Sequence, residues 1–409
     1  MTLSRFRRMP VFIVGLSFAV LATIAAPITL PVMSVAPREM QSQDHPSNEI
    51  SSNFKYDVVS VKPAGPKPDT GNDGYSSDML PDGLRIVQAT LRALIMFKVA
   101  LIGGSGLLGR ALKDELECQA GWQIVATAFS RPSSQMVALD VRDSLAVERF
   151  IEQVAPDAVV IAAAERRPDV CERDPALARA LNVDAVRTIA QAANRHDAWT
   201  LSISTDYVFD GTHPPYRHDS TPAPLNAYGQ SKLEGERALT ETADRGCVLR
   251  LPLLYGPIIN WSESAVTSLV PAIAASAAPD GQAATMDAWA IRYPTFTPDV
   301  AVVIRQMLER HARRETISGI AQWSGDEPMT KYQIAVRLAE ALQLGAHLAP
   351  QHTPTDATPR PHNCHLASSG LEALGIGRRT PFDIAIRRVL AAYPWRGAAT
   401  LIRADSFRA

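Results

Sequence analysis

Gly103-Gly104-Ser105-Gly106-Leu107-Leu108-Gly109 is the stretch of sequence on which the fold assignment depends. It follows an apolar, strand-like run from Phe97 to Ile102 and opens an amphipathic run from Leu107 to Leu116. Its Gly-x-x-Gly-x-x-Gly spacing lets a backbone without side chains approach a pyrophosphate, whose charge the dipole of the following helix favours. A tight strand–helix turn without a ligand is the alternative. In this context the pattern predicts a dinucleotide-binding loop, with Gly103, Ser105, Gly106, Leu107, Leu108 and Gly109 against the cofactor.

Strands and helices alternate after this loop. This alternation predicts an α/β fold, a Rossmann-like doubly wound parallel sheet that binds its ligand at the carboxyl ends of the strands. After Leu253 the pattern is less regular, and we place a smaller C-terminal substrate-binding lobe mainly in residues 254–395. The expected buried strands are Ile124 to Phe129, Ala158 to Ala163 and Trp199 to Ser204. The expected helices of the lobe are Ser264 to Ser276, Pro298 to Arg313 and Lys331 to Leu344.

Three residues form the candidate catalytic set: Thr205, Tyr228 and Lys232. The Tyr-x-x-x-Lys spacing places a phenol and an ammonium one turn apart on a helix that we expect from Asn226 to Thr242. There the cation favours the phenolate and helps the phenol to donate a proton. Thr205, at the end of a strand, would hydrogen-bond a substrate carbonyl, and Lys232 would also hold the nicotinamide ribose. Each residue alone is more often structural, but together with the glycine loop they predict a nicotinamide-dependent reductase.

The stretch after the second strand indicates which cofactor binds. Ala126 to Arg131 contains no Asp or Glu to bind a ribose 2′-hydroxyl, and Arg131 can pair with a 2′-phosphate. NADPH is therefore favoured, NADH is left open, and a solvated surface role is the alternative for Arg131. Asp140 has two interpretations: it contacts the adenine, or it is an ordinary acidic loop residue. We also place Ala162, Ala163 and Ala164 against the cofactor.

Composition excludes several classes of protein. The chain has 409 residues, 46% of them hydrophobic, which is enough for two or three soluble domains. A net charge of -1 gives no reason to expect nucleic acid as a partner. The widely spaced cysteines, without a Cys-x-x-Cys, are expected to be reduced thiols. His362-Asn363-Cys364-His365 has the spacing of no common metal site, so no metal is expected.

The amino-terminal region differs from the rest of the chain. Arg5, Arg7 and Arg8 precede an uncharged stretch from Met9 to Ala36, so residues 1–36 resemble a secretory signal or membrane anchor. A buried helix of a cytosolic domain is the alternative. Residues 37–95 form an irregular segment, rich in Pro, Ser, Asp and Gly, that is too short for a core of its own.

Residues 54–95 resemble part of a family of exported bacterial proteins of unknown function. The resemblance is carried by Tyr56-Asp57-Val58-Val59-Ser60-Val61-Lys62-Pro63, which includes an expected strand, and by Thr90-Leu91-Arg92-Ala93-Leu94-Ile95. Met96 would itself be a natural start for a dinucleotide-binding domain. We therefore expect residues 1–95 to be a fused or misassigned extension, residues 96–395 to be a cytoplasmic reductase domain and residues 396–409 to be a tail.

The region from 97 to 395 resembles the extended short-chain dehydrogenase/reductase family, in the dTDP-4-dehydrorhamnose reductase branch. Its marks are Ser204-Thr205-Asp206-Tyr207-Val208-Phe209-Asp210-Gly211, Tyr228-x-x-x-Lys232 and Arg360-Pro361. A closer similarity runs to the regulatory beta subunits of methionine adenosyltransferase, which belong to the same branch. That similarity is carried by Ala163 to Val170, Pro214 to Arg217, Pro222 to Asn226, Trp323 to Gly325, Met329 to Tyr332 and Leu374 to Phe382.

The resemblance implies two functions. The first is NADPH-dependent reduction of a nucleotide-linked 4-keto sugar in dTDP-L-rhamnose biosynthesis, with Arg360 at the nucleotide diphosphate or, alternatively, a solvated loop charge. The second is a non-catalytic, NADP-binding regulatory subunit that partners a methionine adenosyltransferase catalytic subunit. Asp206 and Tyr207 are assigned to the substrate side, as supports of the site or as loop anchors. Arg166 is assigned there as well, although Glu165-Arg166-Arg167 departs from the usual reductase pattern, as does Ile102 in place of Thr. A homodimer is left open.

Overall fold

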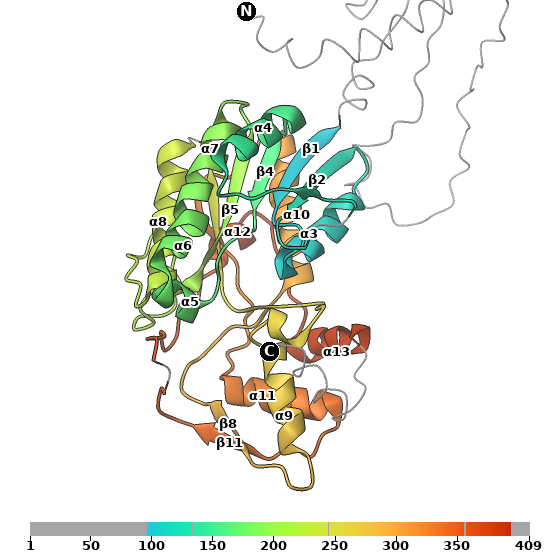
Figure 1. Ribbon diagram of the computed structural model, residues 1–409, viewed down its shortest axis with the longest axis vertical. Helices are drawn as coiled ribbons and strands as arrows, with labels where there is room; N and C mark the ends of the chain where they lie inside the picture. The colour runs from blue at the N-terminus through green and yellow to red at the C-terminus, as the bar shows by residue number, and fades with distance from the viewer. Residues whose placement is uncertain (1–95, 132–133, 244, 356, 394–409) are drawn as a thin grey trace, which may run out of the picture. The chain divides into compact units, whose positions relative to one another are not determined.

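The computed structural model describes residues 96–131, 134–243, 245–355 and 357–393 (Figure 1). The expectations for residues 1–95 and for the tail at 396–409 lie outside these residues. Within the described ranges, no helix is both long and apolar enough to cross a membrane.

A seven-stranded parallel sheet forms the centre of the fold, in the order β10-β6-β5-β4-β1-β2-β3. Strand β1 lies inside the sheet, with Val99 opposite Ile124 of β2 on one side and opposite Ala158 of β4 on the other. After β1 the chain adds β2 and β3 on one side, and it then crosses to add β4, β5 and β6 on the other. Open α/β sheets bind ligands at such a switch point in strand order. The strands are β1 (Phe97–Ile102), β2 (Trp122–Ala128), β3 (Val137–Ala138), β4 (Ala158–Ile161), β5 (Trp199–Thr205), β6 (Cys247–Leu251) and β10 (Gly319–Gln322).

Helices cover both faces of this sheet (Figure 1). On one face, Val99 and Leu101 pack with apolar side chains of α3 and α10. On the other, Ala100 and Ile102 pack with α4, α7 and the end of α8. Because both faces are buried, the strands read as continuous apolar runs rather than as alternating ones. The helices are α3 (Leu107–Glu117), α4 (Ser144–Val154), α7 (Ala185–Asn194), α8 (Ala227–Thr242) and α10 (Thr297–Ala312).

A smaller lobe with its own apolar core follows the sheet domain. Its strands are β7 (Leu254–Tyr255), β8 (Ala284–Asp287), β9 (Thr295–Phe296) and β11 (Leu348–Gln351), and its main helices are α9 (Val270–Ser276), α11 (Lys331–Leu342) and α13 (Phe382–Ala392). The lobe does not take all of residues 254–395, because α10 and β10 return to the sheet domain. The helix expected from Ser264 is also shorter, since a separate 3₁₀ turn, η6 (Thr267–Leu269), precedes α9.

Shorter elements connect these parts. They are α5 (Pro168–Arg173), α6 (Pro175–Arg179), the π-helical turn η3 (Ala180–Asp184), the 3₁₀ turns η4 (Asp206–Val208) and η5 (Trp261–Glu263), and α12 (Ser369–Glu372). Two of these turns lie where the strands of the sheet end. Turn η4 extends the carboxyl end of β5, and η5 brings a segment of the lobe to the glycine loop.

Candidate functional site

The glycine loop adopts a conformation that side chains would prevent. Gly103 has a φ of +90°, and a Cβ atom there would lie 2.8 Å from the backbone nitrogen of Ala163. A Cβ atom on Gly109 would lie 2.1 Å from the carbonyl oxygen of Gly103, so α3 packs directly on the loop. The N-cap residue of α3 is Gly106, which has no side chain to cap the helix. Its first-turn N–H groups therefore suit an anion at the end of the sheet.

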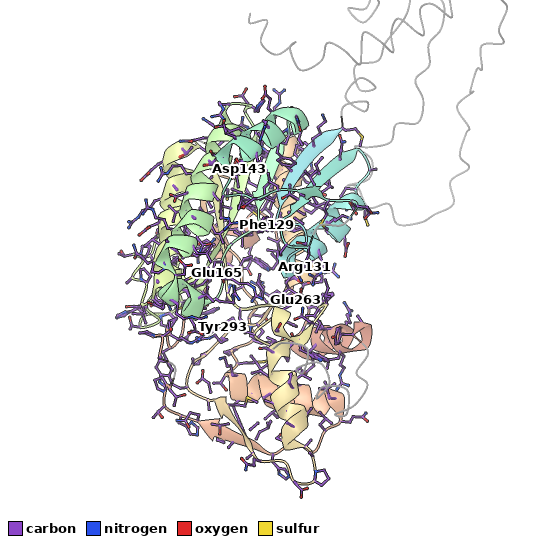
Figure 2. The ribbon with its side chains drawn as sticks, in the orientation of Figure 1. Phe129, Arg131, Asp143, Glu165, Glu263 and Tyr293 are labelled. Atoms are coloured by element: carbon purple, nitrogen blue, oxygen red, sulfur yellow. The ribbon has the colours of Figure 1, made fainter. Side chains whose placement is uncertain are left out.

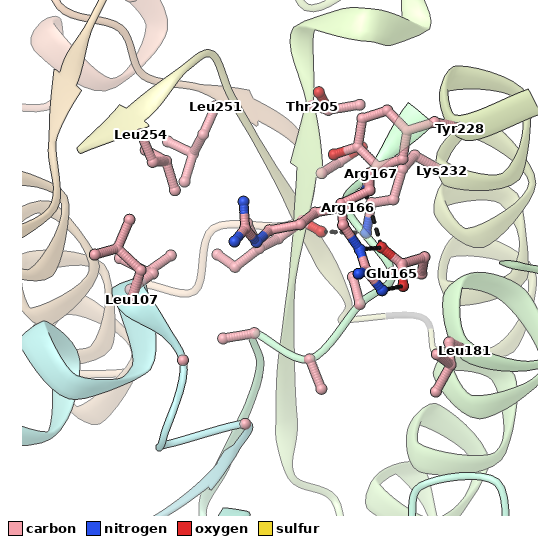
Figure 3. A pocket seen from close by; sticks show the side chains of 18 of the residues that line it. Leu107, Glu165, Arg166, Arg167, Leu181, Thr205, Tyr228, Lys232, Leu251 and Leu254 are labelled. Carbon is pink, nitrogen blue, oxygen red and sulfur yellow. Dashed lines mark hydrogen bonds and ion pairs between the residues drawn. The ribbon is translucent and has the colours of Figure 1, made fainter. Parts of the chain in front are cut away.

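A pocket of about 690 Å³ lies at the carboxyl ends of the strands and extends to the lobe (Figure 3). This volume is in the range of small-molecule sites. The pocket brings together all the sequence-predicted site residues except Gly109, which lies beneath the loop and acts through packing. Those that line it are Gly103, Ser105, Gly106, Leu107, Leu108, Arg131, Asp140, Ala162, Ala163, Ala164, Arg166, Thr205, Asp206, Tyr207, Tyr228, Lys232 and Arg360.

Thr205, Tyr228 and Lys232 lie together on one wall, across the pocket from Leu107 and Leu254 (Figure 3). Helix α8 carries Tyr228 in its first turn because Asn226 caps it, accepting a hydrogen bond from the Gly229 N–H at 2.9 Å. A Cβ atom on Gly229 would lie 2.1 Å from the Tyr207 carbonyl oxygen, so only glycine lets the helix approach η4 this closely.

Burial shifts the pKa values of Tyr228 and Lys232. It raises the pKa of the Tyr228 phenol, an effect that hydrogen bonding with Thr205 opposes, so the phenol keeps its proton at neutral pH. It lowers the pKa of Lys232 to about 8, and the nearby Glu236 carboxylate opposes that change. The Lys232 Nζ donates a hydrogen bond to the Ile203 carbonyl oxygen at 2.7 Å, which fixes the ammonium against β5.

Asp206 and Arg292 form the base of the pocket next to Thr205. Asp206 is 4% exposed, and burial raises the pKa of its carboxyl to about 6 although the charge of Arg292 opposes this. Arg292 is equally buried and donates from Nη1 to the Pro361 carbonyl oxygen at 3.0 Å. Its Nη2 is buried without a hydrogen-bond partner among the described residues. A buried guanidinium of this kind is suited to an anionic ligand.

Sequence reasoning did not find Arg292. The available signal is a single charge at the end of Ala288-Trp289-Ala290-Ile291, a stretch otherwise without charge. Asp206, which was predicted, is a buried part of the site itself rather than only an anchor of the loop.

The Glu165-Arg166-Arg167 segment divides its two arginines between different roles. Arg167 forms an ion pair of 2.6 Å with the buried Glu165, and both residues line the pocket (Figure 3). Arg166 is exposed and lines the pocket. Arg360 lines it too and lies 3.4 Å from Asp169. Arg166 and Arg360, which the sequence assigned to the substrate, therefore both present guanidinium groups to the pocket.

Arg131 lies at the opposite end of the pocket, close to Glu263 (Figure 2). Nearby, Phe129 exposes 62% of its surface, and the Arg142 guanidinium carbon lies 5.3 Å from its ring centre. Arg142 also pairs with Asp140 at 2.6 Å, and its hydrogen bond keeps the pKa of the Asp140 carboxyl below its ordinary value. Asp140 is thus held by Arg142 at the rim, and the exposed aromatic ring offers a flat surface for a base.

The fold of this chain is that of the NAD(P)-dependent Rossmann reductases. A family model described as the RmlD substrate binding domain matches residues 97–394. The chain belongs to this family. Methionine adenosyltransferase 2 subunit beta from Xenopus tropicalis is 43% identical over 295 residues, covering 72% of this chain and 87% of that protein.

Two further comparisons agree with this assignment. A dTDP-4-dehydrorhamnose reductase from Aggregatibacter actinomycetemcomitans is 30% identical over 245 residues, covering 59% of this chain and 78% of that protein. The solved structure of dTDP-4-dehydrorhamnose reductase from Bacillus anthracis, in complex with NADP, is similar with a TM-score of 0.63 at 23% identity, covering 72% of this chain and 98% of that one. The fold and the family resemblance predicted from the sequence are confirmed.

Proposed function

We propose that the chain is an NADP(H)-binding regulatory subunit that acts by binding a methionine adenosyltransferase catalytic subunit. The observation that carries this proposal is the 43% identity to a protein named methionine adenosyltransferase 2 subunit beta, sustained over 87% of that protein's length. The relative named as a reductase is less similar, at 30% identity. Of the two functions that the sequence implied, the comparisons favour the regulatory one.

The geometry of the pocket supports the cofactor part of the proposal. The side-chain-free Gly103 and the glycine N-cap of α3 suit a pyrophosphate, and Ala162 to Ala164 line the same pocket as Lys232. Arg131 lines the same pocket beyond the second strand, where an acid would instead repel a 2′-phosphate. We therefore propose NADPH as the preferred ligand over NADH.

Sedimentation velocity tests the regulatory role. The chain, loaded with NADPH, is mixed with the methionine adenosyltransferase catalytic subunit of the same cell. We expect one boundary that moves faster than either protein alone. Separate boundaries at micromolar concentrations of both proteins would contradict the proposal, since regulatory subunits act through stable contact.

Reductase activity is the second candidate, favoured by the intact wall of Thr205, Tyr228 and Lys232. When bound, NADPH would supply the hydride. Thr205 would hydrogen-bond the substrate carbonyl, and Tyr228 would donate its proton to that oxygen, because burial keeps the phenol protonated. The buried Nη2 of Arg292 would bind an anionic part of the substrate, as a nucleotide diphosphate provides.

NADPH oxidation in the presence of dTDP-4-dehydrorhamnose separates the two candidates. The regulatory proposal predicts that oxidation stays at the rate without substrate. Turnover that disappears in a Tyr228→Phe variant would instead establish the chain as a reductase of this branch.

A further inference from the structure

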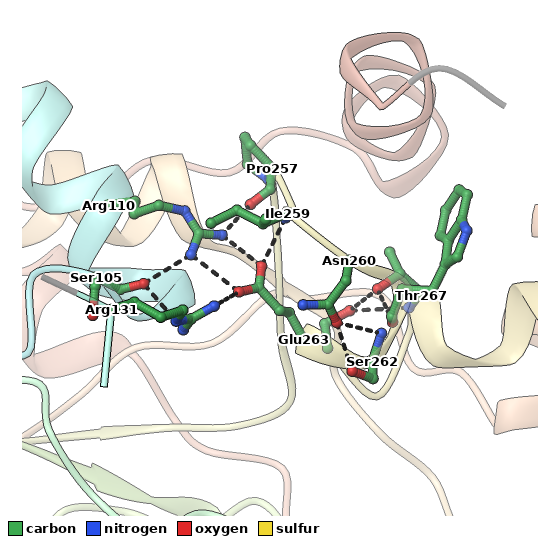
Figure 4. A network of polar contacts seen from close by, with 11 residues as sticks. Ser105, Arg110, Arg131, Pro257, Ile259, Asn260, Ser262, Glu263 and Thr267 are labelled. Atoms are coloured by element: carbon green, nitrogen blue, oxygen red, sulfur yellow. Dashed lines mark hydrogen bonds and ion pairs between the residues drawn. The ribbon is translucent and has the colours of Figure 1, made fainter. Parts of the chain in front are cut away.

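The Glu263 carboxylate, on η5, lies between two guanidinium groups at the glycine loop (Figure 4). Its Oε2 lies 2.7 Å from Nη2 of Arg110, and its Oε1 lies 2.5 Å from Nη1 of Arg131. Arg131 also donates from Nη2 to the Ser105 carbonyl oxygen at 3.2 Å. Glu263 lines the pocket and pairs with Arg131, the residue that we propose binds the 2′-phosphate of the cofactor.

The two arginines contact the Glu263 carboxylate to different extents. Arg110 contacts both carboxylate oxygens, at 3.2 and 2.7 Å, and the Ile259 N–H donates to Oε2 at 2.8 Å. Arg131 contacts one oxygen, and its side chain is 46% exposed against 7% for Glu263. If Arg131 turned toward a ligand, Glu263 would keep Arg110 and the Ile259 N–H. The carboxylate would not be left buried and unpaired, so the exchange of partners costs little.

We propose that Glu263 is a specificity-determining residue that weakens binding of a 2′-phosphate by holding Arg131 and by repelling the phosphate charge. This inference rests on the proposed binding of NADP(H). The carboxylate competes with the phosphate for one guanidinium, and it adds a negative charge within a few ångströms of a dianion. Neither effect acts on NADH, which carries no 2′-phosphate. Glu263 therefore reduces the preference for NADPH that Arg131 alone would give.

Calorimetric titration of a Glu263→Gln variant tests the inference, with 2′,5′-ADP and 5′-AMP as fragments and NADPH and NADH as whole cofactors. The amide keeps the size and the hydrogen-bonding ability of the side chain but removes its charge. We expect the affinity for 2′,5′-ADP and NADPH to rise about three- to fivefold, the upper part of the range for an exposed ion pair. The affinities for 5′-AMP and NADH should stay within about twofold.

Two variants serve as controls. Glu115→Gln changes another glutamate that pairs with an arginine, Arg305 at 2.7 Å, but does not line the pocket, so it should alter no affinity. In an Arg131→Ala background, the effect of Glu263→Gln on 2′,5′-ADP should be smaller, since the contested guanidinium is gone and only the repulsion between carboxylate and phosphate remains. If Glu263→Gln melts below the assay temperature, Glu263→Asp shortens the reach to Arg131 and should act in the same direction.

Unchanged or weaker binding of 2′,5′-ADP in the folded variant would overturn the inference, because Glu263 would then orient Arg131 for the phosphate rather than compete with it. If the unmodified protein binds neither NADPH nor NADH, the cofactor proposal itself fails and this inference falls with it.

Discussion

Replacing Asp206 with Asn should stabilise the protein at neutral and alkaline pH. In the folded chain, burial raises the pKa of the Asp206 carboxyl from its ordinary 3.8 to about 6. A carboxyl with a raised pKa in the folded state contributes stability below its unfolded pKa and loses it as the pH rises toward the folded pKa. Above pH 6 the folded protein therefore carries a penalty for ionising a buried group, and a neutral asparagine side chain at this position would not.

The size of the effect follows from the two pKa values. One pKa unit corresponds to about 1.4 kcal/mol, so the variant should gain about 3 kcal/mol in its free energy of unfolding at pH 8. Near pH 4, where the carboxyl is protonated in the folded chain and roughly half ionised in the unfolded chain, the gain should fall to about 0.5 kcal/mol. Asn keeps an oxygen that can accept the hydrogen bond from Thr205 Oγ1, which is 3.2 Å long in the structure.

Urea unfolding at pH 4, 6 and 8, followed by circular dichroism, measures this dependence. The control is Asp140→Asn, where pairing with Arg142 lowers the carboxyl pKa and no gain is expected at pH 8. A loss of stability at pH 8 in Asp206→Asn would refute the reasoning, because it would mean that the attraction of Arg292 exceeds the cost of burial.

Three further predictions concern the site and the boundary of the domain. Gly109→Ala should lower the melting temperature and abolish NADPH binding, since its Cβ would lie 2.1 Å from the Gly103 carbonyl oxygen. The control is Gly345→Ala, whose Cβ would meet nothing within 4 Å and which should change neither quantity. Thermal melting and fluorescence titration with NADPH measure both variants. Tyr228→Phe should leave NADPH affinity unchanged and lower any reductase turnover about 10²- to 10⁴-fold, and undiminished turnover would remove Tyr228 from the role of proton donor. A chain that begins at Met96 should fold and bind NADPH as tightly as the full chain, and aggregation or weaker binding would show that earlier residues contribute to the core.

Local sequence signals predicted the parts of the site that depend on one strand, one turn and one helix. The strand Phe97–Ile102 has the expected bounds, and α3 and α8 start at or next to the expected residues because glycine and asparagine mark their first turns. The common position of Gly103, Thr205 and Tyr228 followed from the rule that parallel strands present their carboxyl ends at one edge.

Contacts between segments far apart in the sequence were beyond this reasoning. Glu263 meets Arg131 across 132 residues of chain, and Arg292 reaches Pro361 across 69. Neither pairing leaves a periodic pattern in the sequence, because it depends on how the lobe segments fold back. For the same reason the return of α10 and β10 to the sheet was not predicted: an amphipathic helix or an apolar strand does not specify which of two cores it joins.

Isothermal titration calorimetry of the unmodified protein with NADPH and with NADH tests the central claim, that this pocket is a nicotinamide cofactor site with a preference for the 2′-phosphate. We predict one site per chain for NADPH and a weaker one for NADH. The absence of binding heat for both cofactors, confirmed at a second temperature, would contradict the account, and tighter binding of NADH would contradict the role given to Arg131.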